Sequence, residues 1–262
     1  MANVIITNSF VTLTDSMLTA RSENASYPKV ECLKQLRLMA PFRAADVTAT
    51  DYLMTINSGA AQSVAAVALL NCNFDHVQIQ GHASDAWADP TSPGSSLAVS
   101  QNPYTGRYNI FIPLTAWNYQ YMRIYIPAAT AEVGTSNSEW QIGTLVVMSA
   151  ATALATNISY GFSQSADEAT EDIGGDKASI DDTMEWEGTV SFDLRSKTDY
   201  QATILALGRM SKSKPVLIYL NDGDTSEVYL CYREDAISLV RKFNDAISSN
   251  GISYREIARF KR

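Results

Sequence analysis

His76 and His82 are the two histidines of the 262-residue sequence, and any catalysis or metal binding that requires an imidazole depends on them. Residues six apart in an extended strand share a face, so the two rings could meet at one metal ion. Asp75 and Asp85 lie nearby, but no cysteine or close group of carboxylates completes a ligand set. A Ser-His-Asp or Cys-His arrangement would also need one of these histidines, and no G-x-S-x-G segment accompanies them. We therefore expect loop or surface histidines, no enzymatic activity, no cofactor and no bound metal.

The run Asn221-Asp222-Gly223-Asp224 resembles the first half of a calcium-binding loop. An EF-hand needs a glutamate at the twelfth position of its loop and a helix on each side. Here strand-like sequence flanks the run, and an Asp-Gly pair is typical of tight hairpin turns. The sequence thus predicts a turn, with calcium binding as the alternative.

Aromatic and arginine residues in the expected loops of the first half could contact a sugar, because aromatic rings can stack on sugar rings. The alternative is that these rings fill the core or subunit interfaces, since four tryptophans and thirteen tyrosines are readily accommodated there. The candidate carbohydrate-binding residues are Trp87, Tyr104, Arg107 and Trp117.

An acidic segment, residues 166–182, carries seven carboxylates and the pair Gly174-Gly175. Paired carboxylates can act as acid and base on a glycoside, but that chemistry needs fixed placement and a partly desolvated group. A glycine-containing segment poor in apolar residues favours a solvated loop or hairpin arm instead. We expect this arm to contact a neighbouring subunit, or to give a DNA channel a negatively charged wall that repels phosphate. The residues assigned to this contact are Asp167, Glu168, Glu171, Asp172 and Asp176.

Charged residues make up 18% of the sequence, and the formal net charge is −8. The charged fraction is below the roughly 25% usual in soluble domains, which suggests surface buried against partner chains. An acidic protein gains no counterion-release energy on nucleic acid, so we expect no sequence-specific nucleic-acid partner. No run of eighteen apolar residues predicts a membrane span, and residues 1–7 are typical of a strand, not of a signal peptide. Three widely spaced cysteines without a CxxC pair indicate buried thiols in a reducing cytoplasm.

Short β-type segments separated by turn clusters fill the first 150 residues, which favours a sandwich over alternating strands and helices. The expected strands cover 4–14, 52–57, 64–70, 77–80, 108–112, 121–126 and 140–147. A short buried helix is the alternative for 64–70. The stretch 87–108 is rich in proline, glycine and small polar residues, and we expect a long surface loop there.

The pattern changes after Met148, and residues 149–156 are small and polar enough for a linker or connecting strand. Apolar residues recur at helical spacing over 196–210, where Ser196 or Thr198 can cap a helix. The other elements expected in the second half are strands over 184–195, 215–220, 227–233, 237–243 and 253–260. The sequence thus predicts two domains, residues 1–150 and 151–262, in a mainly β protein with one α-helix.

Two segments of the first half resemble the galactose-binding-like (discoidin-type) domains of bacteriophage tail proteins. The first is VAAVALLNCNFDHVQI (64–79), and the second runs from YMRIYIP (121–127) through a polar loop to EWQIGTLVVM (139–148). In that family an arginine-bearing strand precedes a strand of the form W-x-I-G-x-L. Trp140, Ile142 and Leu145 could bury one face, while Gly143 permits a bulge or a close backbone approach. The resemblance implies a jelly-roll β-sandwich for residues 1–150.

The element order of the second half is similar to that of the β-sandwich-plus-helix modules of phage tail-tube, distal tail and tail-tip proteins, which form rings around the tail lumen. This resemblance implies a tail-tube-like β-sandwich or barrel for residues 151–262, in a structural protein of the phage tail tip or baseplate. The implied partners are further copies of the chain in a ring and other tail proteins: tail tube, hub and tape measure. The implied location is the virion tail, assembled in the bacterial host cytoplasm. The alternative function is a carbohydrate-binding module that attaches to a host surface glycan.

Overall fold

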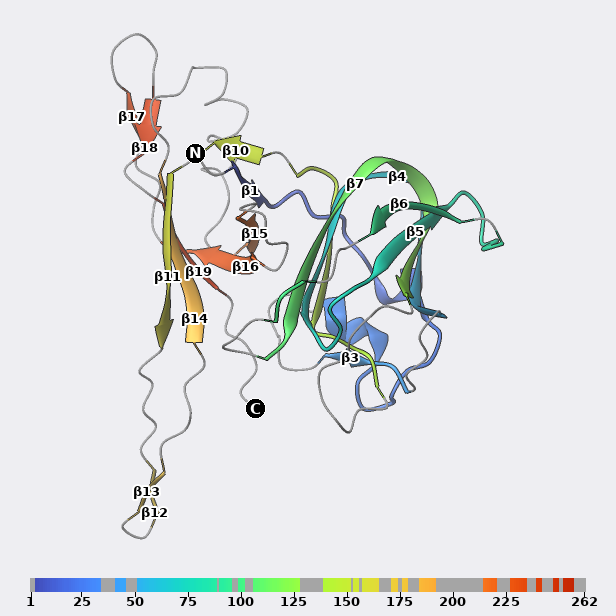
Figure 1. Cartoon of the computed structure of the whole chain (residues 1–262), viewed down its shortest axis with the longest axis horizontal. Helices are drawn as coiled ribbons and strands as arrows, with labels where there is room; N and C mark the ends of the chain where they lie inside the picture. The colour runs from blue at the N-terminus through green and yellow to red at the C-terminus, as the bar shows by residue number, and fades with distance from the viewer. Residues whose placement is uncertain are drawn as a thin grey trace. The chain divides into compact units, whose positions relative to one another are not determined.

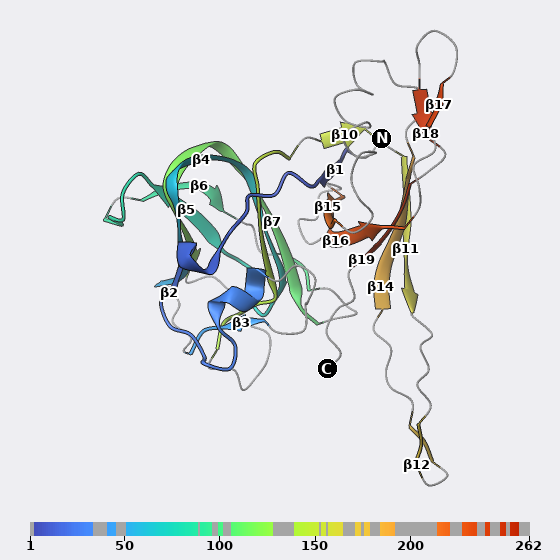
Figure 2. The ribbon, with the colours of Figure 1, turned by 180° about the vertical axis from the view of Figure 1, so that it is seen from behind.

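The computed structural model divides the chain into two compact units, and its ribbon is shown from opposite sides in Figure 1 and Figure 2. The first unit comprises Met1–Ala155 and Pro215–Leu230, and the second comprises Thr156–Lys214 and Cys231–Arg262. The structure describes residues 3–33, 41–45, 51–88, 90–95, 99–101, 106–127, 139–151, 153–155, 157–164, 171–173, 176–178, 184–191, 214–220, 227–234, 239–241, 247–249 and 252–256. Within these ranges, no helix has the length and apolar character of a membrane span.

Strands dominate the first unit, so the expected mainly β, sandwich-like fold is confirmed. Its strands are β1 (Asn3–Thr7), β2 (Leu18–Ala20), β3 (Phe42–Arg43), β4 (Asp51–Cys72), β5 (Gln78–His82), β6 (Thr91–Ser95), β7 (Tyr108–Ile126), β8 (Gln141–Ile142), β9 (Thr144–Met148), β10 (Ala153–Ala155), β15 (Val216–Tyr219) and the start of β16 (Val228–Arg233). Two short 3-10 helices, η1 (Asp15–Met17) and η2 (Lys29–Leu33), accompany them. Strands β10, β1, β15 and β16 are hydrogen-bonded in that order, so residues that the sequence assigns to the second domain pair within the first unit.

The long antiparallel strands β4 and β7 form the frame of the sandwich. Their pairing runs from Asp51 opposite Ile126 to Cys72 opposite Tyr108. The first half of β4 and the last half of β7 share a sheet with β2, β5 and β6, whereas their other halves pair with each other beside β9. Each of the two strands therefore passes through both layers of the sandwich, and Figure 1 shows them curving over together.

The bend of β4 falls where the sequence predicts a break. The pairing register shifts between Asn57 and Gln62, and Gly59 has a φ of 76°, a left-handed value that glycine adopts without a Cβ clash. One strand that bends here thus replaces the two expected strands. Residues 64–70 are part of that strand, which excludes the alternative of a short buried helix.

The core lies between the two layers. It draws buried side chains from each half of the bent strands and from the strands beside them. Examples with an exposed fraction of 1% or less are Met54, Leu69, Ile79, Ile112, Ile124 and Leu145. Full burial of such a side chain stabilises the fold by about 1.5–3 kcal/mol, so this cluster supplies the main driving force for closing the sandwich.

The W-x-I-G-x-L segment behaves as the sequence predicts. The three residues expected to bury one face are buried: Trp140, Ile142 and Leu145. Gly143 lies between β8 and β9, and its N–H donates to the Leu70 carbonyl oxygen at 3.0 Å. A Cβ on Gly143 would lie 2.9 Å from that oxygen and 2.7 Å from the Asn71 Cβ, so the predicted close backbone approach is confirmed.

Buried amides tie the end of β4 to its neighbours. Asn71 has a φ of 59°, a left-handed conformation that asparagine tolerates better than most residues. Its N–H donates to Asn109 Oδ1 (2.9 Å), and Asn109 Nδ2 donates to the Val228 carbonyl oxygen (2.9 Å). The Gln141 N–H donates to Asn73 Oδ1 (2.7 Å). These bonds satisfy polar groups that would otherwise be costly to bury, and they fix β7 against β16 within the first unit.

The prediction of an uninterrupted surface loop over 87–108 is wrong, because β6 lies within it. Strand β6 pairs with β5 at the end of the sheet. Its sequence includes Pro93, and proline is tolerated in an edge strand because no ladder partner needs its missing N–H. Composition alone therefore hides this strand.

In the second unit, the end of β16 is hydrogen-bonded to β19 (Ile252–Glu256), then come β14 (Met184–Ser191) and β11 (Asn157–Gln164). The short strands β12 (Glu171–Ile173) and β13 (Asp176–Ala178) pair with each other, as do β17 (Leu239–Arg241) and β18 (Ile247–Ser249). Trp186 and Tyr254 are buried, and the Trp186 ring lies over Gly188. The helix expected over 196–210 lies outside the described residues.

We predict that Gly143→Ala lowers the free energy of unfolding by about 1–3 kcal/mol, because the added methyl group would meet the Leu70 carbonyl oxygen and the Asn71 Cβ, which no rotamer change can move away. Urea denaturation of the full chain measures the difference. Ala60→Ser, at an exposed position of β4, is the control and should change stability by less than about 0.5 kcal/mol. Equal stability of Gly143→Ala and the native protein would contradict the close approach.

Candidate binding face on the sandwich

The outward residues of β4, β7 and β5 form a grid of three rows across three strands. Cross-strand pairing defines the rows as Tyr52–Tyr125–Gln78, Thr55–Arg123–Gln80 and Asn57–Tyr121–His82. The alternating residues of β7 and β5 point the other way, into the core: Met122, Ile124, Ile126 and Ile79. Trp87 follows β5 and contacts the centre of the grid. We call the nine grid residues together with Trp87 the Arg123 face.

Arg123 lies at the centre of this face and contacts four of its members. Its Nε donates to Gln80 Oε1 at 2.7 Å. Its guanidinium carbon lies 4.6 Å from the ring centroid of Trp87, 5.5 Å from that of Tyr125 and 5.6 Å from that of Tyr52. A cation at such distances is attracted to the electron-rich faces of the rings. The guanidinium is thus held in place by one hydrogen bond and three aromatic contacts.

The positive charge of Arg123 has no carboxylate against it. Across the part of the chain that the structure describes, Arg123 forms no salt bridge, and its terminal amino groups have no hydrogen-bond partner. Asp51 is close enough to act electrostatically on it but lies 3.3 Å from Arg21 Nη1 instead. Burial lowers the pKa of Arg123, and the charges of Tyr125 and Asp51 partly offset this effect. An arginine nevertheless stays protonated, so the face presents a half-buried cation.

Trp87 is fixed by its own contacts. Its Nε1 donates to Asp85 Oδ1 at 2.8 Å, and its ring centroid lies 6.1 Å from that of His82. His82 Nδ1 lies 2.6 Å from the Ser84 carbonyl oxygen. The two histidines expected on loops or the surface are both half-buried, and no group of three or more His, Cys, Asp or Glu side chains within the described ranges could hold a metal ion.

Of the four residues predicted to contact a sugar, the three that the structure describes do not converge. Trp87 belongs to the Arg123 face, but Trp117 is 4% exposed and packs in the core against Tyr119, with ring centroids 5.0 Å apart. Burial removes Trp117 from the candidate set because neither face of its ring is open to a ligand. Arg107 is half-buried directly before β7, at the opposite end of that strand from Arg123. Tyr104 lies outside the described residues.

Three of the five acidic candidates lie in the paired strands β12 and β13. Glu171 and Asp172 belong to β12, and Asp176 begins β13. Asp167 and Glu168 lie outside the described residues, as does the 221–224 run considered for calcium.

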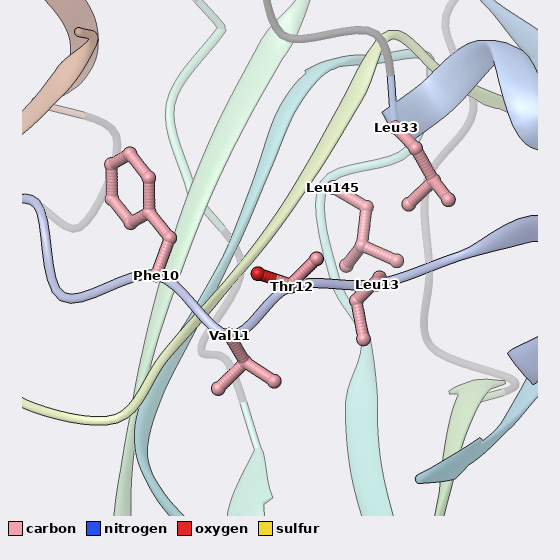
Figure 3. A pocket seen from close by; sticks show the side chains of 6 residues that line it. All are labelled: Phe10, Val11, Thr12, Leu13, Leu33 and Leu145. Atoms are coloured by element: carbon pink, nitrogen blue, oxygen red, sulfur yellow. The ribbon is translucent and has the colours of Figure 1, made fainter.

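A separate pocket of about 320 Å³ lies beside β9 in the first unit (Figure 3). Its lining residues are Phe10, Val11, Thr12, Leu13, Leu33 and Leu145. None of these side chains is a carboxylate, imidazole, amine or thiol, so the lining offers no general acid or base.

The three cysteines are free thiols, and all three are buried. Burial raises the pKa of Cys32 from 9.0 to about 12 and raises that of Cys72 well above its usual range. A thiol that stays protonated and inaccessible is a poor nucleophile, so Cys32 and Cys72 contribute packing and not catalysis.

Most of the Arg123 face was not predicted from the sequence, although alternation of polar and apolar residues along two strands indicates which side chains share a face. Tyr121, Arg123 and Tyr125 alternate with apolar residues along β7, and Gln78, Gln80 and His82 do so along β5. Period-two alternation places each set on one face of a strand. Which strands lie side by side was the missing information.

No protein-family model matches this sequence, and no curated protein matches it. Seven chains of solved structures do. One is a family 89 glycoside hydrolase from Clostridium perfringens, in complex with 2-acetamido-1,2-dideoxynojirmycin. The match has 12% sequence identity and a TM-score of 0.36, and it covers 50% of this chain but 14% of the hydrolase. A likeness this distant identifies neither an activity nor a ligand.

We predict that stability falls between pH 9 and pH 12, in part through Cys32. The unfolded chain releases the thiol proton near pH 9, whereas the folded chain holds it to about 12, so unfolding is favoured as the pH rises through this window. Urea denaturation at pH 8 and pH 10 should show a loss that is about 1 kcal/mol smaller in Cys32→Ala than in the native protein. Val67→Ala opens a core cavity without removing a thiol and should keep the native pH dependence. Identical pH dependence in all three proteins would contradict the raised pKa.

Proposed function

We propose that this chain is a structural component of a phage tail tip or baseplate, which assembles through protein–protein contacts as a homo-oligomeric ring around the tail lumen. The sequence resemblances of both halves support this function, and so does the mainly β fold. Ring formation is assigned to the second unit, where two features favour contact with further chains. Closed rotational symmetry is the usual outcome for such contacts.

The observation that carries the proposal is the unprotected edge strand β11. Among the described strands, β11 pairs only with β14, so one side of its backbone is left without a ladder partner. Natural edge strands usually carry proline or charged residues such as lysine, because an edge without them can pair with strands of other chains. The β11 sequence, NISYGFSQ, contains none of these. An eight-residue edge of this kind is suited to strand addition from a neighbouring copy.

The acidic hairpin supports the same function. Gln164 pairs with Met184 at the end of β11 and β14, and the same two chain segments pair again at Glu171–Ala178 and Ile173–Asp176. Within the described residues, β12 and β13 form a sheet of two strands. An isolated two-stranded ribbon is marginally stable in water, so a contact with another subunit or with a lumen component would stabilise it.

Ser159→Lys tests the edge. Ser159 lies within β11, opposite Thr189 of β14, and a lysine on an edge strand disfavours strand addition. We expect the native chain to form a closed oligomer in sedimentation velocity at micromolar concentration. The variant should dissociate with an apparent constant at least about tenfold higher, or about 1.4 kcal/mol per contact.

Ala60→Lys is the matched control, because it adds the same charge at an exposed position of β4 in the first unit. It should assemble as the native chain does. A native chain that stays monomeric, or a Ser159→Lys variant that assembles normally, would contradict assembly through β11.

Replacing residues 165–183 by Asn-Gly tests the acidic hairpin. Gln164 and Met184 are directly paired, so a two-residue turn can join them, and Asn-Gly is the preferred sequence for such turns. If the hairpin contacts a neighbouring subunit, sedimentation should show loss of the ring, while circular dichroism shows an unchanged β signal. A ring that persists would leave the hairpin for a lumen-facing role and contradict the intersubunit contact.

The second candidate function is carbohydrate binding for attachment to a host surface glycan. The Arg123 face favours it, because that face gathers four aromatic side chains, two glutamines and an asparagine on one side of a sheet. Aromatic rings with a few oriented polar groups are the usual composition of small-ligand sites. A glycan array probed with the labelled chain tests this function, and silence over a broad panel would exclude it.

A further inference from the structure

We propose that the Arg123 face binds an acidic saccharide, with the sugar carboxylate on the Arg123 guanidinium and the sugar ring against the neighbouring aromatic side chains. This inference rests on the second candidate function and names the class of its ligand.

The charge of the face selects an anion. None of the ten residues that form the Arg123 face is an aspartate or a glutamate, and Arg123 is its one permanently charged member. The chain as a whole carries a net charge of −8, so acidic side chains outnumber basic ones, and a cation without a paired carboxylate is unexpected. Asp51, the acid that acts on Arg123 electrostatically, is engaged by Arg21. A ligand carboxylate would pair directly with Arg123, which none of the described carboxylates does.

The geometry of the guanidinium selects a planar, two-oxygen group. Nε is already used by Gln80 Oε1, which leaves the two terminal amino groups as a fork of donors. Gln80 is 6% exposed, and its Nε2 donates to Gln78 Oε1 at 3.4 Å, so the amide that orients the fork is itself held. A carboxylate matches such a fork with two parallel hydrogen bonds. Lysine would lack this geometry because its ammonium is a point charge.

The surroundings of the guanidinium select a sugar over a polypeptide. Trp87, Tyr125 and Tyr52 lie within 5.6 Å of the Arg123 guanidinium carbon, so an anion bound there also meets aromatic rings. The Arg123 face contains no valine, isoleucine, leucine or methionine, and it combines aromatic rings with a few amide groups, as small-ligand sites do. Asn57, Gln78 and the tyrosine hydroxyls provide donors and acceptors for sugar hydroxyl groups.

A matched pair of ligands tests the inference on the native chain. The probe is a hexamer of galacturonic acid, and the comparison ligand is its methyl ester, which keeps the sugar rings and removes the charge. In isothermal titration calorimetry we expect the acid to bind at least tenfold more tightly than the ester. Arg123→Gln should bring the affinity for the acid down to that for the ester, while Trp87→Ala should weaken both ligands.

Two further variants separate geometry from charge. Arg123→Lys keeps the positive charge but loses the donor fork, and we expect it to bind the acid about tenfold more weakly than the native chain. Lys29→Gln removes a positive charge that pairs with Asp15 and Glu23 outside the Arg123 face, and it should bind as the native chain does. Circular dichroism of each variant checks the fold, and the acid–ester comparison stands on the native chain if Arg123→Gln does not fold.

The outcomes separate this inference from the functions proposed above. Equal affinity for acid and ester would overturn the acidic ligand while leaving carbohydrate binding in place, whereas binding of no saccharide would overturn both. Arg123-dependent binding of poly-glutamate, with no binding of the hexamer, would assign the face to a partner protein and overturn the saccharide. None of these results bears on assembly through β11.

Discussion

The antiparallel pairing of β4 with β7 is the constraint on which the first unit depends. Because both strands bend together, one continuous ladder supplies the centre of both layers and fixes how the layers close on each other. The buried side chains of both halves meet in one core, so the pairing register and the hydrophobic packing are specified together. A slip of one residue in β7 would turn Met122, Ile124 and Ile126 outward and bring Arg123 into the core, at a large desolvation cost.

The Arg123 face is a consequence of the same register. With its apolar residues committed to the core, β7 must present Tyr121, Arg123 and Tyr125 on the outer side. On β4 the register shifts between Tyr52 and Met54, so a bulge moves Tyr52 to the outer side while Met54 enters the core. The bulge thereby adds a third ring to the guanidinium, and bulges are known to re-aim side chains in this way.

The sequence carries enough information for the class of fold and for single positions, but not for the pairing of distant segments. The strands near 52, 64, 108, 121 and 140 were predictable from local patterns of apolar residues, and the need for glycine at 143 was predictable from its place in an apolar strand. Local alternation also groups Tyr52 with Met54 and Ile56, which the bulge makes wrong. Trp117 could not be assigned to the core from its polar neighbours, because its burial depends on the distant Gly81, over which its ring lies. Long-range pairing decides each of these cases.

The low fraction of charged residues gains a structural explanation from the two surfaces. A soluble protein normally keeps charges on its exposed strands to prevent unwanted association. Here the eight residues of β11 carry no charge, and the ten residues of the Arg123 face carry a single permanent one. The two surfaces differ in what they offer, because an edge strand binds through its backbone and a sheet face binds through its side chains. They also belong to different units. Sparse charge in this chain is therefore concentrated in two surfaces, an edge strand of the second unit and a sheet face of the first.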